Sequence, residues 1–219
     1  MNTVASTPER AQAGVQVATS RKTTIEVRLA SMEILVGGPY GDHRYGHTAL
    51  RVNTASAERI YDYGRYGQSF GPEGEGVLRI WKSFQAYIDD ENALGRITTG
   101  YLFEISEAKA NEIIASFEKK IVGKPKKLAT RYYQSYVIDR YYALGPNCTT
   151  VSVNGARLAL PSIDVGWEAY QKGRGLSFVE KQAVNMNGWP PYIFMPADLQ
   201  ELLDANKNPV KRKTIYRKK

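Results

Sequence analysis

Cysteine and histidine are scarce in this 219-residue chain, which has one cysteine, Cys148, and two histidines, His43 and His47. One cysteine excludes an internal disulfide. One cysteine and two histidines make no convincing metal site, so we expect no metal and no cofactor. We expect His43 to lie in a loop without a special role. A lone cysteine is often a small buried apolar residue, but it is also a side chain that covalent catalysis uses as nucleophile.

Long apolar runs are also missing. No stretch approaches the about 20 residues that a membrane-spanning helix needs. Residues 1–10 have no basic cap followed by an apolar run, which is the usual form of a secretory signal. We therefore expect a protein that is made in the cytoplasm and is not stably inserted in a membrane. If it acts outside the cell, we expect it to leave by a route that needs no cleaved signal.

Acidic residues are in the minority, because 30 lysines and arginines stand against 22 aspartates and glutamates, for a net charge of +8. A basic surface attracts polyanions such as nucleic acid, anionic lipid or bacterial cell wall. The chain lacks zinc-finger spacing, a paired basic helix and an aromatic single-strand motif, so we expect no nucleic-acid partner. Residues 207–219 are rich in lysine and arginine. We interpret them as a solvated tail; the alternative is a non-enzymatic module that binds a polyanion through this tail.

The hydrophobic pattern predicts an α+β fold with an antiparallel sheet, because strands and helices do not alternate regularly. We expect a flexible leader at 1–20, one domain at 21–205 and a basic tail at 206–219. Residues 64–76 are glycine-rich and predict a long loop, 132–142 are ambiguous between helix and strand, and 166–195 are irregular. The expected strands are 23–36, 46–52, 59–63 and 96–105, and the expected helices are 78–90, 107–122, 148–160 and 196–205.

Cys148 is expected at the first position of a helix, because Asn147 is a good N-cap and follows the turn-forming pair Gly145-Pro146. The free N–H groups of a helix start favour a thiolate, which is the nucleophilic form of cysteine. The backbone N–H of Cys148 could also contribute to an oxyanion hole. For the second donor of such a hole, we weigh Tyr141 and Tyr142.

The strands at 46–52 and 59–63 predict a hairpin that carries the second candidate group. If its turn is centred between Thr54 and Ala55, His47 faces Asp62 directly across the two strands. A carboxylate there would hold one ring nitrogen and leave the other to accept the thiol proton. A three- or five-residue loop would instead place Tyr61 or Tyr63 opposite His47.

Three motifs together resemble a known superfamily. They are Gly46-His47-Thr48-Ala49-Leu50-Arg51-Val52, then Ile60-Tyr61-Asp62-Tyr63-Gly64-Arg65-Tyr66-Gly67, and Asn147-Cys148-Thr149-Thr150. They are similar to the circularly permuted branch of the NlpC-type papain-fold superfamily, which includes cell-wall peptidases and amidases and the lecithin–retinol acyltransferase-like enzymes. In that branch the histidine strand precedes the cysteine helix, as it does here. The resemblance covers about residues 30 to 160.

The resemblance implies a permuted papain-like fold, in which an antiparallel sheet packs against the helix that bears the cysteine. It implies Cys148 as nucleophile, His47 as base and Asp62 as the orienting residue. The implied function is a cysteine hydrolase, an endopeptidase or amidase, that cleaves amide bonds in peptidoglycan stem peptides. The alternative within the superfamily is a lipid-directed thiol acyltransferase or lipase. Lipid-acting members often have a second histidine where this chain has Asp62, which favours the peptidase.

A hydrolase of this kind without a usual signal, and with a basic surface, resembles antibacterial effectors delivered by type VI secretion. This resemblance implies action in the periplasm of a target cell. It implies two protein partners, an immunity protein in the producing cell and a spike or tube protein as carrier.

Overall fold

The computed structural model of the chain describes residues 29–41, 43–70, 73–205 and 210–218. The predicted leader at 1–20 and the first part of the strand predicted at 23–36 lie outside these residues. The strands are β1 (Leu29–Gly37), β2 (His47–Asn53), β3 (Glu58–Gly64), β4 (Ser69–Phe70), β5 (Glu73–Trp81), β6 (Thr98–Ser106), β7 (Lys126–Ala129), β8 (Tyr133–Tyr142) and β9 (Arg212–Tyr216). The α-helices are α1 (Phe84–Ala93), α2 (Glu107–Ile121), α3 (Cys148–Arg157), α4 (Phe178–Asn187) and α5 (Pro196–Ala205), and Trp167–Ala169 form a short 3-10 helix.

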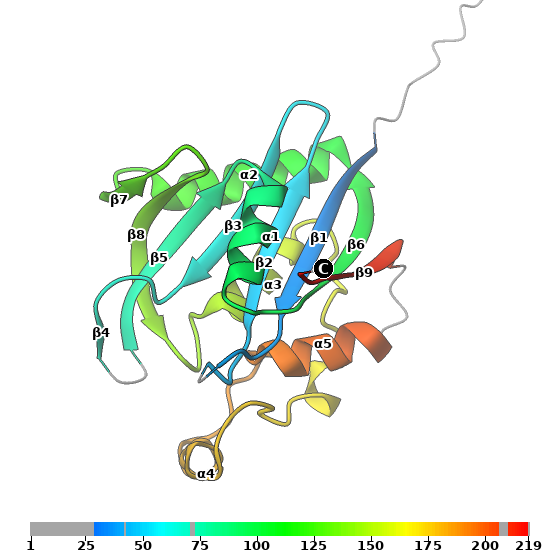
Figure 1. Cartoon of the computed structure of the whole chain (residues 1–219). Helices are drawn as coiled ribbons and strands as arrows, with labels where there is room; N and C mark the ends of the chain where they lie inside the picture. The colour runs from blue at the N-terminus through cyan, green and yellow to red at the C-terminus, as the bar shows by residue number, and fades with distance from the viewer. Residues whose placement is uncertain (1–28, 42, 71–72, 206–209, 219) are drawn as a thin grey trace, which may run out of the picture.

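One antiparallel sheet organises the described part of the chain (Figure 1). Its strands follow the order β7-β8-β5-β3-β2-β1-β6-β9, and β4 pairs with β5 outside this path. Every pairing between these strands is antiparallel. The predicted α+β class with an antiparallel sheet is therefore confirmed. The strands that carry His47 and Asp62, β2 and β3, are neighbours inside the sheet.

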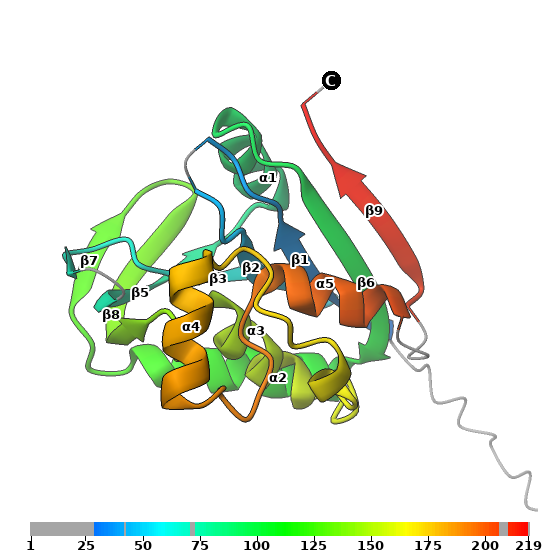
Figure 2. The same ribbon diagram turned by 90° about the horizontal axis from the view of Figure 1, so that it is seen from below.

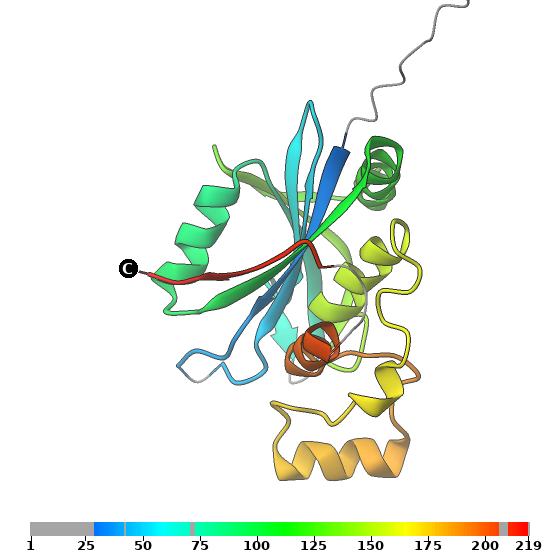
Figure 3. The ribbon, with the colours of Figure 1, turned by 90° about the vertical axis from the view of Figure 1, so that its right-hand side faces the viewer.

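Helices cover both faces of the sheet, so its central strands are buried on both sides. Helix α1 lies on one face, and α2, α3 and α5 lie on the other (Figures 2 and 3). Helix α4 lies outside these layers, beyond the end of the sheet (Figure 1). Only Val184 is buried among the residues of α4. The helix that begins with the cysteine is thus part of a packed layer, whereas α4 is peripheral.

Two apolar cores follow from the alternation of side chains along each strand. The larger core lies between the sheet and the layer of α2, α3 and α5, and in it Tyr61 stacks on Phe117 with ring centroids 4.0 Å apart. The smaller core lies under α1 and contains Leu35, Ala49, Ile60, Trp81, Tyr87 and Ile88. Neighbouring residues of β2 and β3 therefore belong to different cores.

The helix starts predicted at residues 107 and 148 are confirmed. The Ser106 hydroxyl accepts a hydrogen bond from the Lys109 N–H and caps α2. The Asn147 side chain accepts from the Thr150 N–H, and the Thr150 hydroxyl accepts in return from the Asn147 N–H. This reciprocal cap satisfies two N–H groups at the start of α3 and fixes Cys148 as its first residue.

The helix predicted at 78–90 is wrong over its first part, because β5 continues to Trp81 and α1 begins only at Phe84. Strand β5 contributes Leu78 and Ile80 to the larger core and Trp81 to the smaller one. A strand with apolar residues on both faces does not show a period of two, which is why the pattern favoured a helix. The polar side chain of Ser83 caps α1 by accepting from the Ala86 N–H.

The remaining differences lie in the segments that the sequence left irregular. The ambiguous segment 132–142 is strand β8, and its partner β7 is fully exposed and carries no alternating pattern. The loop predicted at 64–76 contains β4 and the start of β5. The irregular segment 166–195 contains α4, which is capped by Ser177. Short, exposed elements have weak hydrophobic periodicity, so their sequences resemble loops.

Part of the predicted basic tail is the edge strand β9, which pairs with β6 from Thr98 to Leu102. Its β-branched and aromatic residues, from Thr214 to Tyr216, favour a strand. The Nζ atom of Lys211 lies 3.1 Å from Glu104, and that of Lys213 lies 2.5 Å from Asp204. These pairings leave less free positive charge for a polyanion than a solvated tail would offer.

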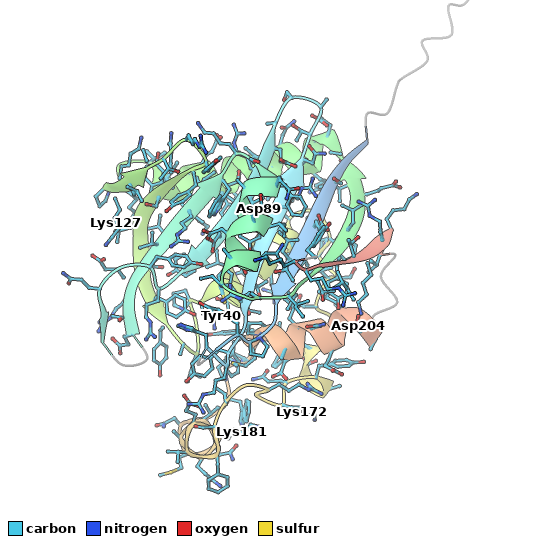
Figure 4. All side chains as sticks on the ribbon, in the orientation of Figure 1. Tyr40, Asp89, Lys127, Lys172, Lys181 and Asp204 are labelled. Carbon is cyan, nitrogen blue, oxygen red and sulfur yellow. The ribbon has the colours of Figure 1, made fainter. Side chains whose placement is uncertain are left out.

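The loop between β1 and β2 marks the end of the sheet at which His47 begins β2. Figure 4 shows Tyr40 of this loop at the lower end of the sheet, on the side of Lys172 and Lys181.

Within the residues that the structure describes, no helix combines the length and apolar character required to cross a bilayer.

Close packing of α3 on β2 generates a stability prediction at Gly155. A Cβ atom at this position would lie 2.7 Å from Leu50 Cδ2 and 2.7 Å from Phe117 Cε2, both in the buried core. We expect Gly155→Val to lower the free energy of unfolding by about 2 kcal/mol, because the added side chain overpacks this contact. Urea unfolding followed by circular dichroism measures the change.

The matched control places the same side chain at the neighbouring position, Asn154→Val, which is exposed on α3. It should change the free energy of unfolding by less than about 0.5 kcal/mol. Equal losses in the two variants would show that the approach of α3 to β2 is not tight at Gly155.

Candidate active site

His47 and Asp62 are brought together by the β2–β3 hairpin, although not in the predicted register. The structure pairs Ala49 with Asp62, and the four residues 54–57 connect the strands. The Thr54 hydroxyl accepts from the Ala57 N–H at 2.9 Å and holds this longer loop. The predicted register, which pairs His47 directly with Asp62, is therefore wrong by two positions. A shift of two positions keeps the same face of the sheet, and Asp62 Oδ1 still lies 2.7 Å from His47 Nε2.

Asp62 is almost fully buried and has partners on both carboxylate oxygens. Oδ1 contacts His47 and also accepts a hydrogen bond from the Tyr66 hydroxyl at 2.7 Å. Oδ2 accepts from the indole N–H of Trp81 at 3.3 Å and lies 3.9 Å from the guanidinium of Arg79. These partners define the orientation of the carboxylate toward the imidazole.

Helix α3 reaches the site from the opposite face of the sheet. The Thr149 and Thr48 hydroxyls lie 3.1 Å apart, and the Ser152 hydroxyl donates to the Thr48 carbonyl at 3.3 Å. The ladder between β2 and β3 begins only at Ala49, so the backbone of Thr48 has no partner in β3 and can bond with α3. Cys148 thus approaches His47 at the first residue of β2, beside the end of the ladder.

Interactions with the His47 ring, the Thr48 backbone and the Thr149 hydroxyl all lower the pKa of the Cys148 thiol, so these three groups lie beside it. Because His47 Nε2 faces Asp62, the other ring nitrogen, Nδ1, is left for the thiol. The structure therefore brings Cys148, His47 and Asp62 together, with the imidazole between the thiol and the carboxylate. This is the geometry that activates a thiol through an oriented imidazole.

The electrostatics of this arrangement favour a thiolate beside an imidazolium. Burial alone would raise the pKa of Cys148, but the hydrogen bond and charge of His47 outweigh it, and the pKa is lowered. Burial opposes protonation of His47, yet the charge and hydrogen bond of Asp62 raise its pKa to about 10. Burial also opposes ionisation of Asp62, but His47, Arg79 and Tyr66 lower its pKa to about 2. Near neutral pH the proton therefore resides on His47.

The two tyrosines weighed as oxyanion donors have different positions. Tyr141 lies beside the Cys148 thiol, because burial, then the charge of that thiol and hydrogen bonding with it, raise the pKa of the Tyr141 phenol. The phenol thus stays protonated and able to donate. Tyr142 points to the other face of β8, and its side chain is exposed. Tyr141 is therefore the tyrosine that the structure brings to the site.

Sequence reasoning missed Tyr66, Arg79 and Trp81 as partners of Asp62. In β5, Arg79 pairs with Asp62 and Trp81 follows two residues later on the same face. Interpreting 78–90 as a helix concealed this alternation. Correct assignment of β5 as the partner of β3 would have revealed both residues.

No three side chains of the metal-binding types cluster among residues 29–41, 43–70, 73–205 and 210–218. His43 lies in the β1–β2 loop, where it stacks on Tyr40 with ring centroids 4.8 Å apart. Cys148, His47 and Asp62 come from α3, β2 and β3. The chemistry available to them is nucleophilic and acid–base.

The chain gives no match to protein-family models, to curated proteins or to solved structures.

Replacing Asp62 tests the charge relationship between the three residues. We expect Asp62→Asn to remove the interaction that keeps His47 protonated, so that the pKa of His47 falls and that of Cys148 rises. The rate of Cys148 alkylation by iodoacetamide, measured from pH 5 to 10, reports the thiolate. At pH 6.5 the variant should react about tenfold more slowly than the wild type, and its rate should rise only near the ordinary thiol pKa of about 8.5.

The control is Asp89→Asn, which removes an exposed carboxylate on α1. Its alkylation profile should match that of the wild type. A wild-type thiol that titrates at its ordinary pKa would contradict the ion pair.

Proposed function

We propose that the protein is a cysteine hydrolase that cleaves amide bonds in peptidoglycan stem peptides. The observation that carries this proposal is the line from Cys148 through His47 to Asp62, with a 2.7 Å contact between the last two. The substrate class comes from the resemblance of the three motifs to cell-wall peptidases and amidases.

The first step of the proposed reaction is attack by the Cys148 thiolate on the carbonyl carbon of the scissile amide. A carbon–sulfur bond forms, and the carbonyl oxygen becomes an oxyanion. His47, protonated and held at Nε2 by Asp62, then donates its proton to the leaving nitrogen. The carbon–nitrogen bond breaks, the amine leaves, and a thioester remains on Cys148.

Water completes the reaction. Neutral His47 accepts a proton from a water molecule, whose oxygen attacks the thioester carbonyl. The carboxylic acid leaves, and the thiolate and imidazolium form again. The lowered pKa of Cys148 and the raised pKa of His47 support this cycle, because both shifts favour the charged forms that the first step needs.

Two donors are available for the oxyanion. The N–H of Cys148 belongs to the first turn of α3, where backbone N–H groups lack intrahelical acceptors. The Tyr141 hydroxyl contacts the thiol and is the proposed second donor. A hydroxyl and a backbone N–H directed at the developing charge would stabilise it more than the neutral carbonyl.

We also propose that the fold is the permuted papain-like fold. The order along the chain supports it: histidine on β2, aspartate on the neighbouring β3, and then the cysteine at the start of α3. The packing of α3 on β2 supports the same assignment, because it places the cysteine helix against the sheet that bears the histidine.

A lipid substrate is the second candidate, and a specific observation favours it. Phe178, Val179 and Met186 of α4 are 77%, 74% and 86% exposed. Helix α4 connects to the site through Glu180, which accepts a hydrogen bond from Tyr45, two residues before His47. An exposed apolar surface beside the site would suit an acyl chain. Thiol chemistry on an ester would use the same three residues.

The proposed setting is that of an antibacterial effector delivered by a type VI secretion machine to the periplasm of a target cell. An immunity protein and a spike or tube carrier are the partners that this setting implies. Directing the protein to the periplasm of a Gram-negative bacterium tests it. Wild type should lyse the cells, and Cys148→Ala should not.

Purified peptidoglycan tests the substrate directly. We expect the wild type to release new muropeptide fragments detectable by mass spectrometry. Cys148→Ala and His47→Ala should lower this release by at least about a thousandfold, because they remove the nucleophile and its proton carrier. Phospholipid vesicles, assayed in parallel for released fatty acid, distinguish the lipid candidate.

The control variant is His43→Ala, which removes the other histidine and should leave the rate unchanged. Release of fragments by Cys148→Ala at the wild-type rate would refute the hydrolase. Release of fatty acid without cleavage of peptidoglycan would show that lipid, and not peptidoglycan, is the substrate.

Removing the Tyr141 hydroxyl tests the oxyanion donor. Tyr141→Phe should lower kcat by about 10- to 100-fold with little change in KM, because the donor acts mainly on the developing charge. Tyr142→Phe, on the exposed face of β8, is the matched control and should retain full activity. Equal effects of both substitutions would contradict the assignment.

A further inference from the structure

Tyr66 folds back over the carboxylate that orients His47. It follows β3 by two residues, and its hydroxyl donates to Asp62 Oδ1 at 2.7 Å. The same hydroxyl lies 3.3 Å from His47 Nε2. The fold-back needs Gly64, because a Cβ atom there would lie 2.5 Å from Tyr66 Cε2. The hydroxyl of Tyr66 thus meets both members of the His47–Asp62 pair.

Arg79 holds the Tyr66 ring from the other side. Its guanidinium carbon lies 3.4 Å from the centroid of the Tyr66 ring and 5.4 Å from that of Tyr133. One guanidinium nitrogen lies 3.9 Å from Asp62 Oδ2. Arg79 therefore does two things at once, since it stacks on the residue that binds Oδ1 and provides positive charge beside Oδ2.

We infer that Tyr66 and Arg79 are positioning residues for the reaction: they fix the carboxylate of Asp62 so that it holds the imidazole of His47 toward the Cys148 thiol. This inference rests on the catalytic roles of these three residues under the proposed function. It assigns no contact with substrate to Tyr66 or Arg79. The two residues act only on how the proton of His47, which the first step of the reaction uses, is held in place.

The geometry explains why a carboxylate that is 1% exposed needs such support. Each oxygen of Asp62 has two partners from different segments: His47 and Tyr66 at Oδ1, Trp81 and Arg79 at Oδ2. With both oxygens occupied, rotation of the carboxyl group would break several contacts together. If Tyr66 is lost, the carboxylate can turn or take a proton, and the imidazolium loses its partner.

A purely electrostatic role for Tyr66 predicts the opposite effect. A hydroxyl that donates to a carboxylate withdraws some of its negative charge from other partners. Removing the hydroxyl from an immobile Asp62 would then strengthen the attraction between Asp62 and His47. The thiol would become more acidic, not less. The direction of the change in Cys148 reactivity therefore distinguishes positioning from charge withdrawal.

Other charged and titratable groups also face this cluster. They come from α1 and the segment that follows it, and from β8 and α3; they are Tyr87, Asp90, Glu91, Arg96, Tyr133 and Cys148. A Tyr66→Phe substitution keeps all of them and retains the ring that stacks on Arg79. A changed pH profile in this variant would therefore report the lost hydroxyl.

The test measures iodoacetamide alkylation of Cys148 against pH in Tyr66→Phe, which needs no substrate. We expect the midpoint of the profile to rise by about one pKa unit, the scale of one lost hydrogen bond to a charged group. Tyr132→Phe, at an exposed tyrosine, is the matched control and should leave the midpoint unchanged. A midpoint that stays or falls in Tyr66→Phe would overturn the inference.

Arg79 provides the second arm. Arg79→Lys keeps the positive charge but loses the flat stacking on Tyr66, and it should raise the midpoint as Tyr66→Phe does. Arg79→Gln should raise it at least as far, and Arg59→Gln on β3 is the control. If Arg79→Gln does not fold, Arg79→Lys and Tyr66→Phe still decide. Lowered thermal stability in both, with wild-type alkylation profiles, would show a structural role only and overturn the inference.

Peptidoglycan hydrolysis by the same variants separates this inference from the proposed function. Positioning predicts a loss of kcat that follows the shifted profile, with KM preserved. If the wild type shows a lowered thiol pKa in the alkylation profile but cleaves no peptidoglycan, the proposed substrate is excluded. The positioning roles of Tyr66 and Arg79 would still stand.

Discussion

The hydrogen bond between His47 and Asp62 is the interaction on which the candidate site depends. It forms at the end of the sheet, between a histidine at the first residue of β2 and a carboxylate inside β3. A carboxylate this deeply buried costs free energy unless hydrogen bonds and opposite charge compensate. His47, Tyr66, Trp81 and Arg79 supply that compensation. The result is an imidazole whose pKa is raised and which lowers the pKa of the neighbouring thiol.

The fold makes this meeting possible by leaving the β2–β3 ladder incomplete. Because pairing begins at Ala49, the backbone of Thr48 is open to α3 rather than to β3. The Ser152 hydroxyl donates to the Thr48 carbonyl there, the Thr149 hydroxyl contacts the Thr48 hydroxyl, and the cap at Asn147 fixes where the helix begins. Segments a hundred positions apart are thus brought into register by small polar side chains, while the apolar cores on either side provide the bulk of the packing.

Sequence reasoning predicted the parts of this site that have local signals. Asn147 indicated the helix start, and the hydrophobic pattern indicated β2 and β3. The predicted register was wrong by an even number of residues, so it still placed His47 and Asp62 on the same face of the sheet. The hairpin register was hidden because the Thr54 side chain stabilises a loop of four residues, 54–57. Strand β5 was hidden because both its faces are apolar, and with it the roles of Arg79 and Trp81. The return of Tyr66 over Asp62 has no local pattern, since it depends on space above Gly64.

The position of the site between two separate cores has a consequence for how such a protein can change. Helix α3, which begins with Cys148, is anchored by the packing on one face of the sheet, and the partners of Asp62 are anchored by the packing under α1. A substitution deep in either layer can therefore alter the acidity of Cys148 without contacting it. Substitutions on either side of the sheet, in evolution or in a laboratory library, would then be selected through their effect on the same proton.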